Sequence, residues 1–133
     1  MLRLLPPLCW TGFIAYFGGD QWGGADTAAW LGPLLRALLP SASPEGLATV
    51  HLLIRKGAHV IEYAVLVVLW RRSVGGAWGP LGLAVLTASL DELRHWFTPE
   101  RVGSVADALL DGAAAAMTLA LMAACGRQRG EAS

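Results

Sequence analysis

The sequence predicts an all-α integral membrane protein, a bundle of four transmembrane helices with a short amphipathic helix between the first and the second. Of its 133 residues, 55% are hydrophobic and only 15% are charged, whereas soluble domains contain about 25% charged residues. The apolar runs are rich in Leu, Ala and Gly and lack the strict alternation of barrel strands. Because one crossing needs roughly 20 apolar residues, about four spanning helices fit into this length, and a large aqueous domain does not.

The four predicted spans follow the apolar runs in chain order. They cover residues 4–17, 47–70, 77–97 and 105–125. Pro6 and Pro7 stand in the first turn of the first span, where a helix tolerates proline. The third and fourth runs have the length that crosses a hydrocarbon core of about 30 Å. We therefore predict one membrane domain over residues 1–125 and a polar C-terminal tail over residues 126–133.

A shorter apolar segment separates the first two spans. Asp26 can cap a helix over Thr27–Leu39, which Pro33 would kink or break and Pro40 would close. Leucines recur along it at helical spacing, and Arg36 is its only charge. Such a segment is typical of a helix that lies along the membrane surface or re-enters it.

The distribution of arginine predicts the orientation of the chain. Arg71 and Arg72 occupy the turn between the second and third spans, Arg3 precedes the first span, and Arg127 and Arg129 follow the fourth. No acid accompanies the two arginines of the turn. By the positive-inside rule, these segments and both termini face the cytoplasm. The other side also carries bases. Apart from Arg36, these stand among acids, where a site can hold them: Arg55, Lys56, Arg94 and Arg101.

The ionisable residues within the spans are clustered, although one charge at a helix centre costs about 2.5–3.5 kcal/mol on insertion scales. The clusters are His51, Arg55, Lys56, His59, Glu62 and Tyr63 in the second span, Asp91, Glu92 and His95 in the third, and Asp107 and Asp111 in the fourth. Helical spacing places the members of each cluster on one face. On the predicted topology all three faces lie toward the extracytoplasmic side. We expect them to converge on one pocket, with Arg94 and Arg101 at its rim.

These clusters resemble the VanZ-like family of small bacterial membrane proteins. The resemblance rests on Lys56-x-x-His59-x-x-Glu62-Tyr63, Asp91-Glu92-x-x-His95-x-Phe97-x-Pro99-x-Arg101 and Asp107-x-x-x-Asp111-Gly112, and it covers Arg55 to about Leu121. It implies a multi-pass cell-membrane protein, in a family named for a member linked to resistance against the glycopeptide teicoplanin, and it supplies no reaction. The family usually has glutamine where this chain has His95, and asparagine where it has Asp111.

Binding of an anionic amphiphile is the function that this pocket favours, with a role in glycopeptide resistance implied by the resemblance. Lys56, Arg94 and Arg101 would hold a phosphate or carboxylate while an apolar groove takes the lipid tail. A cell-envelope lipid precursor or a lipid-tailed glycopeptide has both parts. The predicted ligand-binding residues are Lys56, His59, Glu62, Tyr63, Asp91, Glu92, His95, Arg101, Asp107 and Asp111.

The alternative is a membrane-embedded hydrolase or transferase that acts on a lipid headgroup. Its candidate acid–base residues are His59, Glu62, Asp91, Glu92 and His95. His59 is the stronger base candidate, because Glu62 follows one turn later and the family usually has a non-titrating glutamine at the position of His95.

Three further interpretations carry less weight. The charges could merely pair and lock the helices together, but small residues achieve that at lower cost. His59-x-x-Glu62 with Glu92-x-x-His95 has the spacing of a metal site in a helix bundle, yet the family's usual glutamine removes one ligand, so we expect no metal and no cofactor. Ten acids against ten bases exclude a strongly basic nucleic-acid binder.

Overall fold

The protein is helical throughout the part that the structure describes. The computed structural model describes the backbone of residues 2–18, 24–97 and 105–131, and the side chains of residues 2–18, 26–97 and 105–126. A short 3-10 helix, Leu2–Leu4, leads into the first α-helix. The five α-helices are α1 (Leu5–Phe17), α2 (Gly24–Leu38), α3 (Pro44–Val74), α4 (Trp78–Trp96) and α5 (Val105–Glu131). No strand occurs within these ranges, so the predicted all-α class is confirmed.

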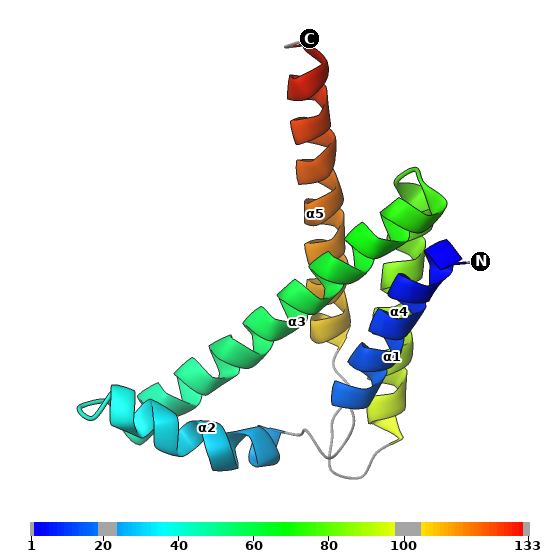
Figure 1. Cartoon of the computed structure of the whole chain (residues 1–133). Helices are drawn as coiled ribbons and strands as arrows, with labels where there is room; N and C mark the ends of the chain where they lie inside the picture. Colours follow the sequence, from blue (N-terminus) through cyan, green and yellow to red (C-terminus); the bar gives the residue numbers. More distant parts are fainter. Residues whose placement is uncertain (1, 19–23, 98–104, 132–133) are drawn as a thin grey trace.

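Four of the helices pack together, and the fifth extends from them as an arm. Helix α1 lies beside α4, while the long helix α3 crosses the bundle diagonally and packs against α5, α4 and α1 (Figure 1). Helix α2 packs on the first half of α3, at a steep angle to α1 and α4 (Figure 1). The chain start and the last turns of α5 lie at one end of the bundle. The ends of α1 and α4 and the start of α5 lie at the other, which we call the polar end (Figure 1).

A small apolar core forms where the four helices meet. Its buried members are Ile14 of α1, Tyr63, Leu66, Val67 and Trp70 of α3, Ala84 and Ala88 of α4, and Ala115 and Leu119 of α5. The contributions of α4 and α5 are mostly alanines, whose small side chains let helices approach closely. This packing holds the polar residues of α3, α4 and α5 at the same depth.

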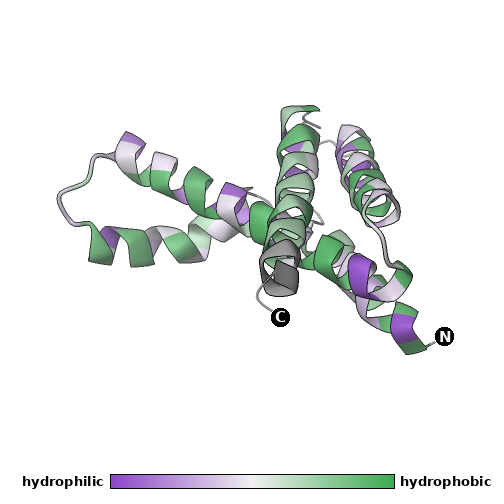
Figure 2. Cartoon of the chain, turned by 90° about the horizontal axis from the view of Figure 1, so that it is seen from above, coloured by the Kyte–Doolittle hydropathy of each residue, from purple (hydrophilic) through white to green (hydrophobic). Residues whose placement is uncertain are grey.

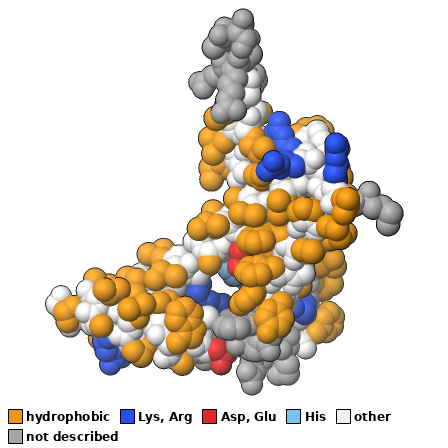
Figure 3. Space-filling model, in the orientation of Figure 1, with side chains coloured by type: hydrophobic (Ala, Val, Ile, Leu, Met, Phe, Trp, Pro, Cys, Tyr) orange, Lys and Arg blue, Asp and Glu red, His pale blue; other side chains and the backbone are white. Residues whose placement is uncertain are grey.

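The outside of the bundle is largely apolar. Hydrophobic residues recur along the helices (Figure 2), and hydrophobic side chains cover much of the face seen in Figure 3. Large side chains such as Trp78 and Phe97 are 85% and 81% exposed. Soluble monomers rarely leave so much apolar surface in water. Among the described helices, one segment, Val105–Gly126 of α5, is long and apolar enough by itself to cross a membrane.

Helix α2 differs in detail from the prediction. It begins at Gly24, so Asp26 lies in its first turn instead of capping it, and it continues through Pro33 without a break. Glycine and alanine at its start adopt the helical backbone, and an acid in the first turn favours the helix dipole. The predicted short amphipathic helix between the first and second spans therefore exists, but it begins three residues and ends one residue earlier than expected.

Helices α3 and α5 are both longer than the apolar runs that predicted them. Helix α3 begins at Pro44, where the Ser43 hydroxyl accepts a hydrogen bond from the Gly46 N–H at 3.1 Å, and it ends at Gly75, whose φ of 72° belongs to the left-handed region. Helix α5 continues to Glu131, so the segment predicted as a tail is helical to that residue. A single glycine such as Gly126 costs a helix about 1 kcal/mol, too little to end it.

Candidate functional site

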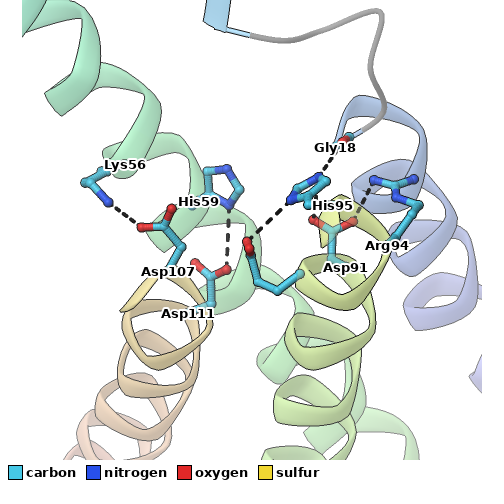
Figure 4. A network of polar contacts seen from close by, with 9 residues as sticks. Gly18, Lys56, His59, Asp91, Arg94, His95, Asp107 and Asp111 are labelled. Carbon is cyan, nitrogen blue, oxygen red and sulfur yellow. Dashed lines mark hydrogen bonds and ion pairs between the residues drawn. The ribbon is translucent and has the colours of Figure 1, made fainter. Parts of the chain in front are cut away.

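The described candidate residues gather at the polar end of the bundle. Figure 4 shows Lys56 and His59 of α3 facing Asp107 and Asp111 of α5, with Asp91, Arg94 and His95 of α4 close to the end of α1. The sequence therefore correctly predicts that three polar faces lie together. Arg101, expected at the rim, lies outside the described residues, as do Pro99 and Ser104.

The first set of contacts, the α1–α4 seam, ties the end of α4 to the end of α1. Arg94 Nη2 donates to Asp91 Oδ1 at 2.7 Å, and Arg94 Nη1 donates to the Ala15 carbonyl at 2.6 Å. His95 Nε2 lies 2.9 Å from the Gly18 carbonyl, and a carbonyl only accepts, so Nε2 is the donor. A Cβ at Gly18 would lie 2.9 Å from Arg94 Nη2. Glycine at this position lets the two helices approach.

The second set, the α3–α5 seam, joins side chain to side chain. Lys56 Nζ forms a hydrogen-bonded ion pair with Asp107 Oδ1. His59 Nδ1 lies 3.6 Å from Asp111 Oδ2, which is close enough for an electrostatic interaction but too long for a hydrogen bond. The Lys56 and Asp107 side chains are 42% and 39% exposed, whereas the Asp111 side chain is 3% exposed. The outer pair is therefore the more exposed one, while in the inner pair the His59 side chain is 28% exposed and Asp111 is buried.

Several buried polar atoms have no hydrogen-bond partner among the described residues. They include the Tyr63 hydroxyl, in a side chain that is 0% exposed, together with His59 Nδ1 and Asp111 Oδ1. Most buried polar atoms in proteins are hydrogen-bonded, and exceptions often mark functional positions. All three atoms belong to residues that the sequence predicts for the site.

A cavity of about 220 Å³ opens beside these residues, between α1, α2, α3 and α4. Its lining consists of Ile14, Phe17, Gly18, Thr27, Trp30, Arg55, Ala58, His59, Glu62 and Asp91. Figure 3 shows acidic and histidine side chains in a notch on this face, with basic side chains beside the notch. The cavity thus combines charged groups with an aromatic and aliphatic wall, as a site for an amphipathic molecule requires.

Arg55 is the base that this cavity presents. It forms no hydrogen bond or ion pair with any residue in the described part of the chain, whereas Lys56 pairs with Asp107 and Arg94 with Asp91. Arg55 is missing from the predicted ligand-binding residues. The sequence could have indicated this residue, because Arg55 shares the polar face of the second span with His59.

A second arrangement at the polar end has the geometry of a metal site. Asp91, Glu92 and His95 are buried, and each offers one ligand atom such that these atoms lie within 4.8 Å of one another. The sequence spacing suggested instead a site shared between His59-x-x-Glu62 and Glu92-x-x-His95. The observed group comes from the last turns of α4 alone.

Comparison with known families identifies the family of this chain. The family model of VanZ/LLP1 matches residues 7–126, nearly the whole chain. The match includes every residue of both seams and of the cavity, and it confirms the family predicted from the polar motifs. No curated protein and no solved structure matches the chain.

Proposed function

The chain belongs to the VanZ/LLP1 family, and on that premise we propose that it binds an anionic amphiphile at the polar end of a membrane bundle. The proposed ligand is a cell-envelope lipid precursor or a lipid-tailed glycopeptide. Its anionic group lies against Arg55, and its tail leaves the cavity past Phe17 and Trp30. A role in teicoplanin resistance would follow if the glycopeptide itself is the ligand.

The observation that carries this proposal is the position of Arg55. A guanidinium offers a planar fork of donors that fits phosphate and carboxylate groups. At Arg55 this fork lines an apolar-walled cavity and forms no ion pair with a described carboxylate. Glu62 and Asp91, on the same wall, would repel a second negative charge and so favour a ligand with one anionic group.

We further propose that the bundle crosses the membrane four times, through α1, α3, α4 and α5, with both termini in the cytoplasm. Three observations support this topology. The bundle surface is apolar, both chain ends lie away from the polar end (Figure 1), and Arg3 and Arg71–Arg72 lie at that opposite end, where the Ser73 hydroxyl donates to the Arg3 carbonyl. The steep angle of α2 to the other helices suits a helix that lies along the outer membrane surface.

Reporter fusions test the topology. Green fluorescent protein joined after Ser133 should fluoresce, and alkaline phosphatase joined there should be inactive, because the first folds in the cytoplasm and the second outside it. Alkaline phosphatase inserted after Ala42, between α2 and α3, should be active. The reverse pattern at both positions would overturn the proposed orientation. Inactive alkaline phosphatase at both positions would overturn the three crossings proposed between them, by α3, α4 and α5.

Ligand retention tests the binding site. The detergent-solubilised protein is incubated with undecaprenyl phosphate, with teicoplanin or with phosphatidylcholine, and bound molecules are counted by native mass spectrometry. We expect one of the two anionic ligands to be retained, and Arg55→Gln to weaken its retention at least about tenfold, the loss typical of one charge-assisted contact. Arg36→Gln, a loss of the same charge outside the cavity, is the matched control. Equal retention by the parent and Arg55→Gln would overturn the proposal.

The same experiment tests the enzymatic alternative. His59 lines the cavity and has the Asp111 carboxylate 3.6 Å behind its Nδ1, the arrangement of a base with an orienting acid. Time-dependent release of the phosphate headgroup by the parent, and its loss in His59→Ala, would establish catalysis. Retention of intact ligand supports binding alone.

A further inference from the structure

We propose that Asp91, Glu92 and His95 form a binding site for a divalent transition-metal ion at the end of α4. This site shares Asp91 with the cavity of Arg55, but it does not depend on the proposed ligand. The sequence alone favours no metal, because the family's usual glutamine in place of His95 removes one ligand. The structure instead places two carboxylates and an imidazole from consecutive turns of one helix in a single buried group.

The distances between the His95 nitrogens and the two carboxylates suit atoms that bind one common ion better than atoms that share a hydrogen bond. His95 Nδ1 lies 3.6 Å from Glu92 Oε1, and His95 Nε2 lies 3.9 Å from Asp91 Oδ2. Both separations are too long for hydrogen bonds. Two ligand atoms held about 2.1 Å from a tetrahedral ion are separated by about 3.4 Å, close to the distance between Nδ1 and Oε1. Small rotations of the side chains would bring both atoms onto a common ion.

The orientation of His95 is that of a metal ligand. Its Nε2 donates to the Gly18 carbonyl at 2.9 Å, so in the neutral ring Nδ1 carries the lone pair. Metal-binding histidines usually donate their second ring N–H to a carbonyl or carboxylate, which fixes the tautomer and the ring plane. The Gly18 carbonyl therefore supplies the outer contact, and the lone pair of Nδ1 faces Glu92.

The Tyr63 hydroxyl is an independent indication that something binds here. It lies on α3, its side chain is 0% exposed, and the hydroxyl has no hydrogen-bond partner among the described residues. The charges of Asp111, Asp91, Glu62 and Glu92 all act on it electrostatically. A water molecule or carboxylate held by a metal ion at Asp91 and Glu92 would give this hydroxyl its missing partner.

The ligand types narrow the choice of ion. Imidazole together with carboxylates suits zinc, manganese and iron, whereas magnesium and calcium prefer oxygen ligands alone. Of the two carboxylates, Asp91 also pairs with Arg94, so Glu92 supplies the negative charge that this ion pair does not neutralise. We therefore choose Zn²⁺ as the probe, because it has no redox chemistry and accepts a ligand set of nitrogen and oxygen atoms.

Metal content of the full chain tests the site. The protein is purified in detergent through a tag without histidine, stripped with a chelator, equilibrated with Zn²⁺ and desalted, and zinc is then measured by mass spectrometry. We expect one bound Zn²⁺ per chain and at least about tenfold weaker binding in His95→Gln. The glutamine amide can still donate to the Gly18 carbonyl while the ligand atom is lost. His51→Gln, a histidine that contacts Thr27 at 3.1 Å outside the group, is the control and should bind as the parent does.

Two outcomes would overturn the site. One is a parent that retains no stoichiometric zinc, and the other is equal zinc affinity in the parent, His95→Gln and Glu92→Gln. Glu92→Gln provides a second ligand variant in case His95→Gln does not fold. Because Arg55→Gln should lose the amphiphile yet keep the zinc, failure of this proposal is distinguishable from failure of the proposed function.

Discussion

The two seams at the polar end use similar residues in different ways. In the α1–α4 seam, Arg94 and His95 donate to backbone carbonyls, and the His95 and Asp91 side chains are only 7% and 8% exposed. In the α3–α5 seam, both partners of each contact are side chains, and the outer pair of Lys56 and Asp107 is about two-fifths exposed. The α1–α4 seam is thus held by backbone carbonyls of the neighbouring helix, whereas the α3–α5 seam can open by rotation of side chains.

This difference assigns the two seams different physical roles. A contact to a backbone carbonyl fixes the position of a helix, because the acceptor cannot rotate away. An exposed ion pair contributes little to stability, since water and salt screen it. The α1–α4 seam therefore positions the end of α4, and the α3–α5 seam is the side of the site that can exchange partners. Three experiments test this distinction.

The largest effect is expected for Asp91→Ala. This substitution leaves Arg94 beside α1 without its carboxylate, and we expect the free energy of unfolding to fall by about 2 kcal/mol, less than for a fully buried pair because Arg94 is partly exposed. Tryptophan fluorescence during unfolding in mixed micelles measures the change, with a chelator present so that metal does not contribute. Asp107→Ala, the same change in the other seam, is the control. Equal losses in the two variants would contradict the distinction.

A smaller effect is expected for Gly18→Ala. The new Cβ would lie 2.9 Å from Arg94 Nη2, 2.9 Å from the Ile14 carbonyl oxygen and 3.0 Å from Asp91 Oδ1. The ion pair and the last turn of α1 therefore both have to shift, at a cost of about 1 kcal/mol. The same unfolding assay measures it.

Gly12→Ala is the matched control for Gly18→Ala. It lies in the same helix, and its Cβ would meet no atom within 4 Å, so it should be neutral or slightly stabilising. The loss from Gly18→Ala should shrink in part in an Arg94→Ala background, because the contact with the Ile14 carbonyl remains there. A loss that does not shrink at all would show that the strain lies at this carbonyl and not at the ion pair.

The sequence was sufficient for the parts of the fold that depend on periodicity. Apolar runs located all the packed helices, and helical spacing placed His59 beside Glu62 and Asp107 beside Asp111 on common faces. Helix ends were less predictable, because α3 and α5 extend past their apolar runs into polar turns that hydropathy does not register. The two ends of α3 depend on Ser43 and Gly75, which cap the helix through local backbone contacts.

The candidate site was predictable in composition but not in pairing. Spacing along one helix does not show which base meets which acid on the next helix. The sequence therefore grouped Lys56 and Arg94 with Arg101 as anion ligands, whereas the structure pairs Lys56 with Asp107 and Arg94 with Asp91. The contacts from Arg94 to Ala15 and from His95 to Gly18 join residues far apart in the chain through backbone carbonyls. The pattern of side chains in a sequence does not show which backbone carbonyls accept such hydrogen bonds.

The smallest effect is expected from the Lys56–Asp107 pair. A double-mutant cycle of Lys56→Met and Asp107→Asn should give a coupling of about 0.2–1 kcal/mol, the range of exposed ion pairs, and it should decrease when salt is raised. A coupling above about 2 kcal/mol that salt does not change would show that the pair behaves as a buried one. The α3–α5 seam would then be as rigid as the α1–α4 seam, and it would not be the side of the site that opens. A weak, salt-sensitive coupling places the mobility of the site between α3 and α5, next to the cavity that Arg55 lines.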